Sequence, residues 1–275
     1  MTDDWLRAAA RPVRFAKIDP TVPNIARVWN YLVGGRDNFA ADRFAARQLI
    51  DAAPVVEAIG PAARAFLYRV VGYLAADAGV RQFLDIGTGI PTAGNTHEVA
   101  QAVDPRCRIV YVDNDPVVLV HARALLRSSP EGVTSYLDAD ARQPGKIIEA
   151  ARETLDFDQP VAVVLIGVLN FIAGTAGEIG AILRTLLDAA PSGSYLALTQ
   201  AASDLDESLL TAQQRWNEMA ATPVWLRDRA AVTSWFDGLE LIEPGVVELD
   251  QWRPAEGDPR GDGVLPMYGA VGRKP

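Results

Sequence analysis

The chain has 275 residues, of which 49% are hydrophobic and 22% charged, a balance that is typical of a folded globular protein and excludes a disordered one. Its formal net charge of −9 repels nucleic acid, and no apolar stretch reaches the roughly 18 residues that a membrane helix needs. A single cysteine and two histidines exclude an internal disulfide and a Cys/His zinc site, so we expect no bound metal.

Residues 1 to about 20 predict an irregular arm. The arm lacks the apolar region of a signal peptide, so we expect a cytoplasmic protein. It holds a basic run that acidic residues flank, and we interpret this run as a solvated surface rather than a nucleic-acid site. The run consists of Arg7, Arg11, Arg14 and Lys17.

Helical spacing of apolar residues dominates the rest of the first eighty positions. Pro23 suits the first turn of a helix, which Gly34 and Gly35 then end. Further helices are predicted over 42–50 and 58–77, the second with an apolar stripe along one face.

From residue 81 onward, short apolar runs alternate with helical segments, as in βαβ units that build a parallel sheet. The predicted strands are 82–86, 108–113, 134–137, 161–168, 194–199, 239–242, 246–250 and 267–271. The predicted helices between them are 96–102, 117–126, 146–154, 178–190 and 205–221, and a hairpin is expected across the Gly/Asp/Pro-rich loop 253–263. The sequence therefore predicts an α/β fold with a Rossmann-like, doubly wound, mostly parallel sheet in residues 81–275, preceded by an N-terminal helical extension or lid in residues 1–80.

A glycine turn follows the first predicted strand. Asp85 stands two residues before Gly87, and Gly87-Thr88-Gly89 forms a Gly-x-Gly turn that can bring the backbone close to a ligand. A dinucleotide-phosphate site would continue as Gly-x-x-Gly, whereas here Gly89 is followed by Ile90-Pro91-Thr92-Ala93-Gly94. The turn therefore departs from the phosphate-binding fingerprint.

Acidic residues also end the next two strands. Asp113 ends the second strand, at the edge where a carboxylate can accept hydrogen bonds from ribose hydroxyls. Asp140 follows the third strand, where a side chain can meet an adenine amino group. Because the carboxyl ends of parallel strands meet at one edge of a sheet, we expect Asp85, Asp113 and Asp140 to converge.

Through the turn from Asp85 to Gly89, the strand end at Asp113 and the pair Asp140-Ala141, the chain resembles class I S-adenosylmethionine (SAM) dependent methyltransferases. More narrowly, residues 23–32, 34–39 and 89–98 resemble an actinobacterial family of SAM methyltransferases once known only as DUF574. The resemblance spans nearly the whole chain and implies SAM as the cofactor. The residues that it assigns to cofactor binding are Asp85, Gly87, Thr88, Gly89, Asn95, Asp113, Asn114, Asp140 and Ala141, together with Asn30, Tyr31 and Gly34 of a lid segment.

Methyl transfer requires no metal and no covalent nucleophile, since SAM already carries an activated methyl group and the protein mainly aligns the reactants. His97 and Asn170 are the weak candidates for a catalytic role, and His121 and Asp37 are further candidates for a base. Three of these residues also have a purely structural interpretation: a helix cap or solvent group for His97, the end of a strand for Asn170, and a packed or solvated position within a helix for His121. Trp216, Trp225, Trp235 and Trp252 can either line an acceptor pocket or fill the core.

Three functions remain open at this point. The leading hypothesis is a methyltransferase acting on an unidentified small-molecule acceptor, and the first alternative is a regulator that binds SAM without turning it over. The second alternative is a nicotinamide-dependent oxidoreductase, against which Pro91 argues. The sequence supports no particular oligomeric state, and a homo-oligomer stays open.

Overall fold

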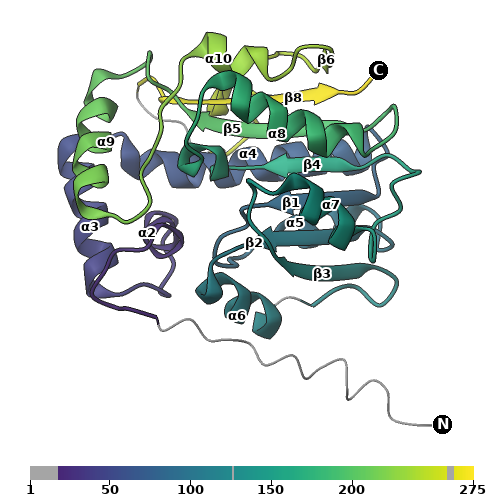
Figure 1. The fold of residues 1–275 in the computed structure, drawn as a ribbon, viewed down its shortest axis with the longest axis horizontal. Helices are drawn as coiled ribbons and strands as arrows, with labels where there is room; N and C mark the ends of the chain where they lie inside the picture. The colour runs from purple at the N-terminus through teal and green to yellow at the C-terminus, as the bar shows by residue number, and fades with distance from the viewer. Residues whose placement is uncertain (1–17, 126, 259–262) are drawn as a thin grey trace.

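The computed structural model describes residues 18–125, 127–258 and 263–275, which form a central sheet with helices on both faces (Figure 1). The strands are β1 (Gln82–Ile86), β2 (Arg108–Asp113), β3 (Val133–Asp138), β4 (Ala162–Leu165), β5 (Tyr195–Ala201), β6 (Glu240–Leu241), β7 (Val247–Glu248) and β8 (Met267–Arg273). The helices are α2 (Ile25–Leu32), α3 (Ala40–Ala52), α4 (Val56–Ala76), α5 (Thr96–Val103), α6 (Pro116–Leu125), α7 (Pro144–Ala151), α8 (Ala176–Asp188), α9 (Glu207–Met219) and α10 (Arg229–Ser234), with two short 3-10 helices, η1 (Val168–Phe171) and η2 (Leu249–Gln251).

The strand order is β3-β2-β1-β4-β5-β8-β6, and β7 pairs with β8. Strands β1 to β5 are parallel, whereas β8 runs antiparallel to β5, β6 and β7. This topology confirms the predicted Rossmann-like, doubly wound, mostly parallel sheet. The antiparallel pairing of β7 with β8 agrees with the hairpin expected across the loop between them, of which residues 259–262 lie outside the described chain.

Neighbouring residues of β1 point to opposite faces of the sheet, as the twofold period of a strand requires. Phe83 belongs to a buried cluster with Phe66 of α4, whereas Leu84 belongs to a second cluster with Ile147 of α7 and Leu183 of α8. Each face of the sheet is therefore sealed by its own helical layer.

The N-terminal helices share their core with the sheet. Helices α2, α3 and α9 lie together at one end of the molecule (Figure 1), and the cluster around Phe83 also includes Val28 of α2, Ala45 of α3 and Trp216 of α9. The boundary at residue 80 stays a prediction, but the helices before it are packed against the rest of the fold.

A buried ion pair fixes the start of α2. Arg27 Nε donates to Asp42 Oδ2 at 2.8 Å, and Asp42 also accepts from the backbone N–H groups of Asn24 and Phe39. Arg27 Nη2 donates to the carbonyl of Val22 at 2.7 Å. Because both charges are paired and hydrogen-bonded, their burial is tolerated, and the N-terminal segment is held in one position.

Some predicted elements have different bounds. The strand predicted over 161–168 is too long, because Gly167 adopts a φ of +83° and the chain turns into η1. The strand predicted over 246–250 is reduced to Val247–Glu248 by η2, and the short helix α10 was not predicted. The predicted arm up to residue 17, with its basic run, lies outside the described residues.

Candidate functional site

A cavity of about 730 Å³ lies at the carboxyl edge of the parallel strands. Its floor is the glycine turn after β1 and the ends of β2, β3 and β4, and the segments 24–29, 63–67, 166–173 and 221–225 form its walls. Ligands of open α/β sheets bind at this edge, outside the carboxyl ends of the strands. The position of the cavity therefore matches the prediction from the three acidic strand ends.

The glycine turn has positive φ angles, which residues with a side chain rarely adopt. Gly87 has a φ of +76°, and a Cβ there would lie 2.3 Å from Cβ of Val168. Gly89 has a φ of +67°, but a Cβ there would meet no atom within 4 Å. Gly87 is thus required by packing, whereas Gly89 leaves an open space where a ligand can approach the backbone.

Asp113 supports this turn from the neighbouring strand. Its Oδ2 accepts from Gly89 N at 2.9 Å and its Oδ1 from Asp115 N at 2.9 Å. Burial raises the pKa of Asp113 to about 6, although these backbone hydrogen bonds oppose the shift.

Asp85 is buried at the end of β1, where its Oδ2 accepts from Thr96 Oγ1 at 2.6 Å. Burial raises the pKa of Asp85 to about 6, while the Thr96 hydroxyl and the charge of Arg64 lower it. Both carboxylates at the centre of the cavity are therefore desolvated, and positively charged or hydrogen-bond-donating ligand groups would stabilise them.

Asp140, Ala141 and Asn114 lie at the end of the cavity beside β2 and β3. Asp140 pairs with the guanidinium of Arg142, and the hydrogen bond from that side chain lowers the pKa of Asp140. Asn95 also lines the cavity. Nine of the twelve residues proposed from the sequence for cofactor binding are therefore brought together here: Asp85, Gly87, Thr88, Gly89, Asn95, Asp113, Asn114, Asp140 and Ala141.

The other three, Asn30, Tyr31 and Gly34, do not line the cavity. Asn30 is buried, and its Oδ1 accepts from Asp37 N and from Asn38 Nδ2, each at 2.9 Å. Asn30 therefore stabilises the loop that follows α2, because both hydrogen bonds to its Oδ1 come from that loop.

The two weak candidates for catalysis also lie outside the cavity lining. His97 Nδ1 is 2.9 Å from the hydroxyl of Tyr111, and burial lowers the pKa of His97. Asn170 Oδ1 accepts from Ala201 N at 2.8 Å, and the backbone carbonyl of Asn170 accepts from Trp225 N at 2.7 Å. Both side chains hold neighbouring segments together and neither is placed to take a proton in the cavity.

The further candidates for a base, His121 and Asp37, face one another. His121 Nε2 lies 3.6 Å from Asp37 Oδ1, and neither residue lines the cavity.

Among the lining residues that were not assigned to the cofactor site from the sequence are Asn24, Trp29, Arg64, Asp115 and Phe171. Asn24 and Asp115 carry a local signal, because asparagine and aspartate are favoured N-caps: Asn24 caps α2 by accepting from Arg27 N, and Asp115 accepts from Val117 N at the start of α6. Trp29 and Arg64 lie on α2 and α4 and reach the cavity only through the way in which these helices pack.

Of the four tryptophans that could line an acceptor pocket, only Trp225 lines this cavity. It is 41% exposed, whereas Trp216, Trp235 and Trp252 are buried in the core. The pocket interpretation of those three was wrong.

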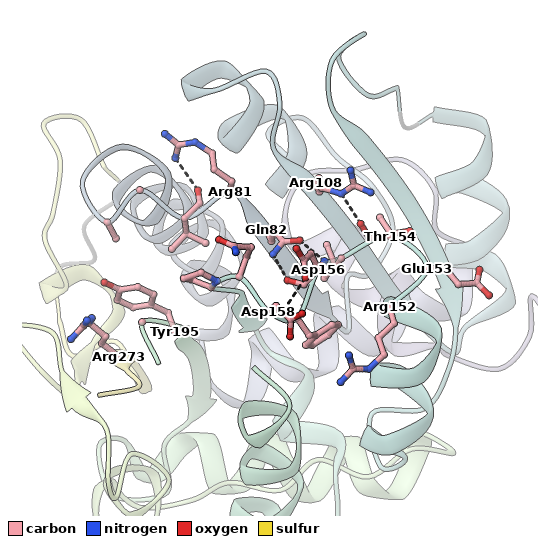
Figure 2. A pocket seen from close by; sticks show the side chains of 18 residues that line it. Arg81, Gln82, Arg108, Arg152, Glu153, Thr154, Asp156, Asp158, Tyr195 and Arg273 are labelled. Carbon is pink, nitrogen blue, oxygen red and sulfur yellow. Dashed lines mark hydrogen bonds between the residues drawn. The ribbon is translucent and has the colours of Figure 1, made fainter. Parts of the chain in front are cut away.

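A second hollow, of about 870 Å³, lies at the amino ends of β1 and β2 (Figure 2). Arginines lie around it and are bound to nearby groups: Arg81 donates to Asp104, and Arg108 donates to the carbonyl of Thr154, as Figure 2 shows. This hollow has neither a glycine turn nor converging buried carboxylates, so the cavity at the carboxyl edge is the candidate site.

Within the described residues, no three His, Cys, Asp or Glu side chains are arranged to hold a metal ion. In the same part of the chain, every helix is too short or too polar to cross a membrane.

Comparison with known proteins adds to this geometry. Residues 12–275 match the family model described as S-adenosyl methyltransferase. A solved DUF574 family protein from Streptomyces avermitilis is 40% identical, with 94% of this chain and 99% of that chain covered and a TM-score of 0.88. A solved protein from Thermobifida fusca, a proposed methyltransferase, is 37% identical, with 92% and 96% covered and a TM-score of 0.83. No curated protein matches the chain significantly.

Proposed function

Since this chain belongs to the S-adenosyl methyltransferase family, we propose that it transfers the methyl group of SAM to a small-molecule acceptor held in the cavity at the carboxyl edge of the sheet. Family membership makes the chain a SAM-dependent methyltransferase and confirms the resemblance found in the sequence. It also decides against the nicotinamide-dependent oxidoreductase. The observation that carries the assignment to this cavity is the open glycine turn flanked by the desolvated carboxylates of Asp85 and Asp113.

The cavity lining fits the three chemical parts of SAM. Asp113, beside the open backbone at Gly89, is our proposed acceptor for the ribose hydroxyls. Asp140 and Ala141 are proposed to flank the adenine, and Asp85 to receive the ammonium of the amino acid end. A desolvated carboxylate gains most from a ligand that brings a donor or a positive charge, which supports both aspartate assignments.

When bound, SAM supplies a sulfonium-activated methyl group. The chain then has to position the acceptor in line with this group and to exclude water. Trp29, Phe171 and Trp225 come from α2, η1 and the loop after α9, and give one part of the cavity wall an apolar, aromatic character. We propose that this wall binds the apolar body of the acceptor.

No protein base is included in this proposal. His97 is engaged with Tyr111 and lies outside the cavity lining, so we propose that rate acceleration comes from alignment and desolvation. The acceptor atom would then be one whose lone pair can attack the methyl group without a protein base first removing a proton.

We propose that the N-terminal segment 24–29, rather than the predicted residues Asn30, Tyr31 and Gly34, covers the cofactor. Asn24 contacts the loop after β2, and Trp29 lines the cavity. A cytoplasmic location stays a prediction, and so does a preference against nucleic acid, which the net charge of −9 supports.

The experiment that tests this function has two parts. Calorimetric titration with S-adenosylhomocysteine (SAH) and NADH should show binding of SAH alone, with the affinity lost in Asp113→Ala and kept in Asp158→Ala, which changes an exposed acid of the second hollow. Incubation with SAM and a panel of aromatic and aliphatic small molecules should then produce SAH only with an acceptor present. SAH binding without turnover on any acceptor would instead support the SAM-binding regulator.

A further inference from the structure

Arg64 and Asp85 carry opposite charges into the same cavity from different layers of the fold. Arg64 lies on α4, and Asp85 ends β1. They influence one another electrostatically, since each appears among the charges that shift the pKa of the other. Yet no nitrogen of Arg64 lies within 4.0 Å of a carboxylate oxygen of Asp85 or of any other acid in the described chain.

The guanidinium of Arg64 is held in a fixed orientation by one of its nitrogens. Nη2 donates to the carbonyls of Ala93 at 2.8 Å and of Gly94 at 2.6 Å. Tyr68, one helical turn later on α4, packs its hydroxyl against Gly94 from the same side. Nε and Nη1 donate to no residue in the described part of the chain, so the guanidinium retains N–H donors that can bind a carboxylate.

Arg64 and Asp85 are both partly removed from water, yet neither forms an ion pair with an opposite charge in the described chain. Burial is the main cause of the lowered pKa of Arg64 and of the raised pKa of Asp85, which shows that each charge is destabilised where it lies. Unpaired buried charges are costly, and a pair that shares a cavity but stays apart leaves room for a ligand carrying both opposite charges.

We propose that Arg64 binds the α-carboxylate of the cofactor while Asp85 binds its α-ammonium, so that the chain selects adenosyl ligands that carry a complete α-amino acid. This inference rests on the proposed function, because it assumes that SAM and SAH occupy this cavity. It adds a residue to the cofactor site that neither the glycine turn nor the acidic strand ends indicate.

The test compares three ligands by calorimetry: SAH, decarboxylated SAH, which keeps the ammonium but lacks the carboxylate, and methylthioadenosine, which lacks the whole amino acid. In the unaltered chain, SAH should bind about 10 to 100-fold more tightly than decarboxylated SAH, the range expected for a charge-assisted hydrogen bond. Arg64→Gln should lose that difference while leaving methylthioadenosine binding unchanged. Arg47→Gln, at an exposed position of α3 outside the cavity lining, is the matched control and should change nothing.

Each outcome decides one claim. If Arg64→Gln weakens SAH and methylthioadenosine equally, Arg64 is a structural residue and the inference is overturned. If the variant binds SAH as tightly as the unaltered chain, the inference fails while the proposed function stands. If the unaltered chain binds no SAH, the proposed function itself fails.

Discussion

Asn24 Nδ2 donates to Asp115 Oδ2 at 2.6 Å, which joins two helix caps that lie 91 residues apart in the sequence. Asn24 caps α2, and Asp115 Oδ1 accepts from Val117 N in the first turn of α6. The bond therefore ties the N-terminal segment to the loop after β2 at the rim of the cavity.

Asn24→Ala is expected to remove this link and the cap of α2 together. We expect a loss of about 1–2 kcal/mol in the free energy of unfolding, measured in urea, and faster dissociation of SAH in stopped-flow experiments. Asp206→Ala removes the cap of α9, away from the cavity, and is the control: it should cost similar stability without changing SAH dissociation. Equal dissociation rates in the two variants would show that the link does not retain the cofactor.

Asp85→Asn is expected to stabilise the ligand-free protein while weakening SAH binding. The pKa of Asp85 is raised from 3.8 to about 6 in the fold, so the folded state binds its proton more readily than the unfolded chain does. The cost of the buried carboxylate is therefore absent below pH 4 and develops as the pH rises through 6, reaching about 3 kcal/mol. Urea unfolding of both proteins should show the variant gaining on the unaltered chain between these pH values, and a constant difference would contradict this account.

SAH binding should weaken below pH 6. The pKa values of Asp85 and Asp113 are both raised to about 6, and binding of donor groups requires both carboxylates to be ionised. Calorimetry should give a constant Kd above about pH 7 and a rising Kd as the pH falls through 6. In Asp85→Asn, one of the two ionisations is removed, so the dependence should be shallower; an unchanged slope would show that Asp85 does not titrate in this range.

Gly94→Ala should destabilise the fold for two separable reasons. The new Cβ would lie 1.4 Å from the hydroxyl of Tyr68, and the φ of Gly94 is +74°. Gly79→Ala is the control, because Gly79 has a φ of +69° but no atom within 4 Å of its Cβ, and it should cost only the conformational term of about 1 kcal/mol. Gly94→Ala should cost more, and the added substitution Tyr68→Ala should recover the excess in urea unfolding.

The central strands and the glycine turn could be predicted from the sequence because their signals are local. β1 and β2 have the predicted bounds, since short apolar runs are followed directly by Asp and Gly. The strand before Gly167 was predicted too long because its apolar residues continue through a turn that only the positive φ of Gly167 reveals. Periodicity cannot distinguish an apolar strand from an apolar 3-10 turn.

The walls of the cavity could not be predicted in the same way. Arg64 lies on a helix whose rotation about its own axis is set by packing of Phe66 and Val70 in the core, and this rotation decides that Arg64 faces the cavity. Asn30 stands in a segment with a polar and glycine-rich pattern typical of a lid, yet its side chain is used up within its own loop. A sequence pattern indicates which residues are polar, but the tertiary structure determines which groups these residues contact.

The position of β8 bears on how the protein is made. Met267–Arg273 lies between β5 and β6 in the sheet, so β6 has no neighbouring strand to join until residue 273 has left the ribosome. The apolar face of α4, synthesised some two hundred residues earlier, packs in the same cluster as Met267 and Val271. Until β8 has emerged, the chain therefore carries an incomplete layer, and β8 then joins β6 to the sheet and completes this core.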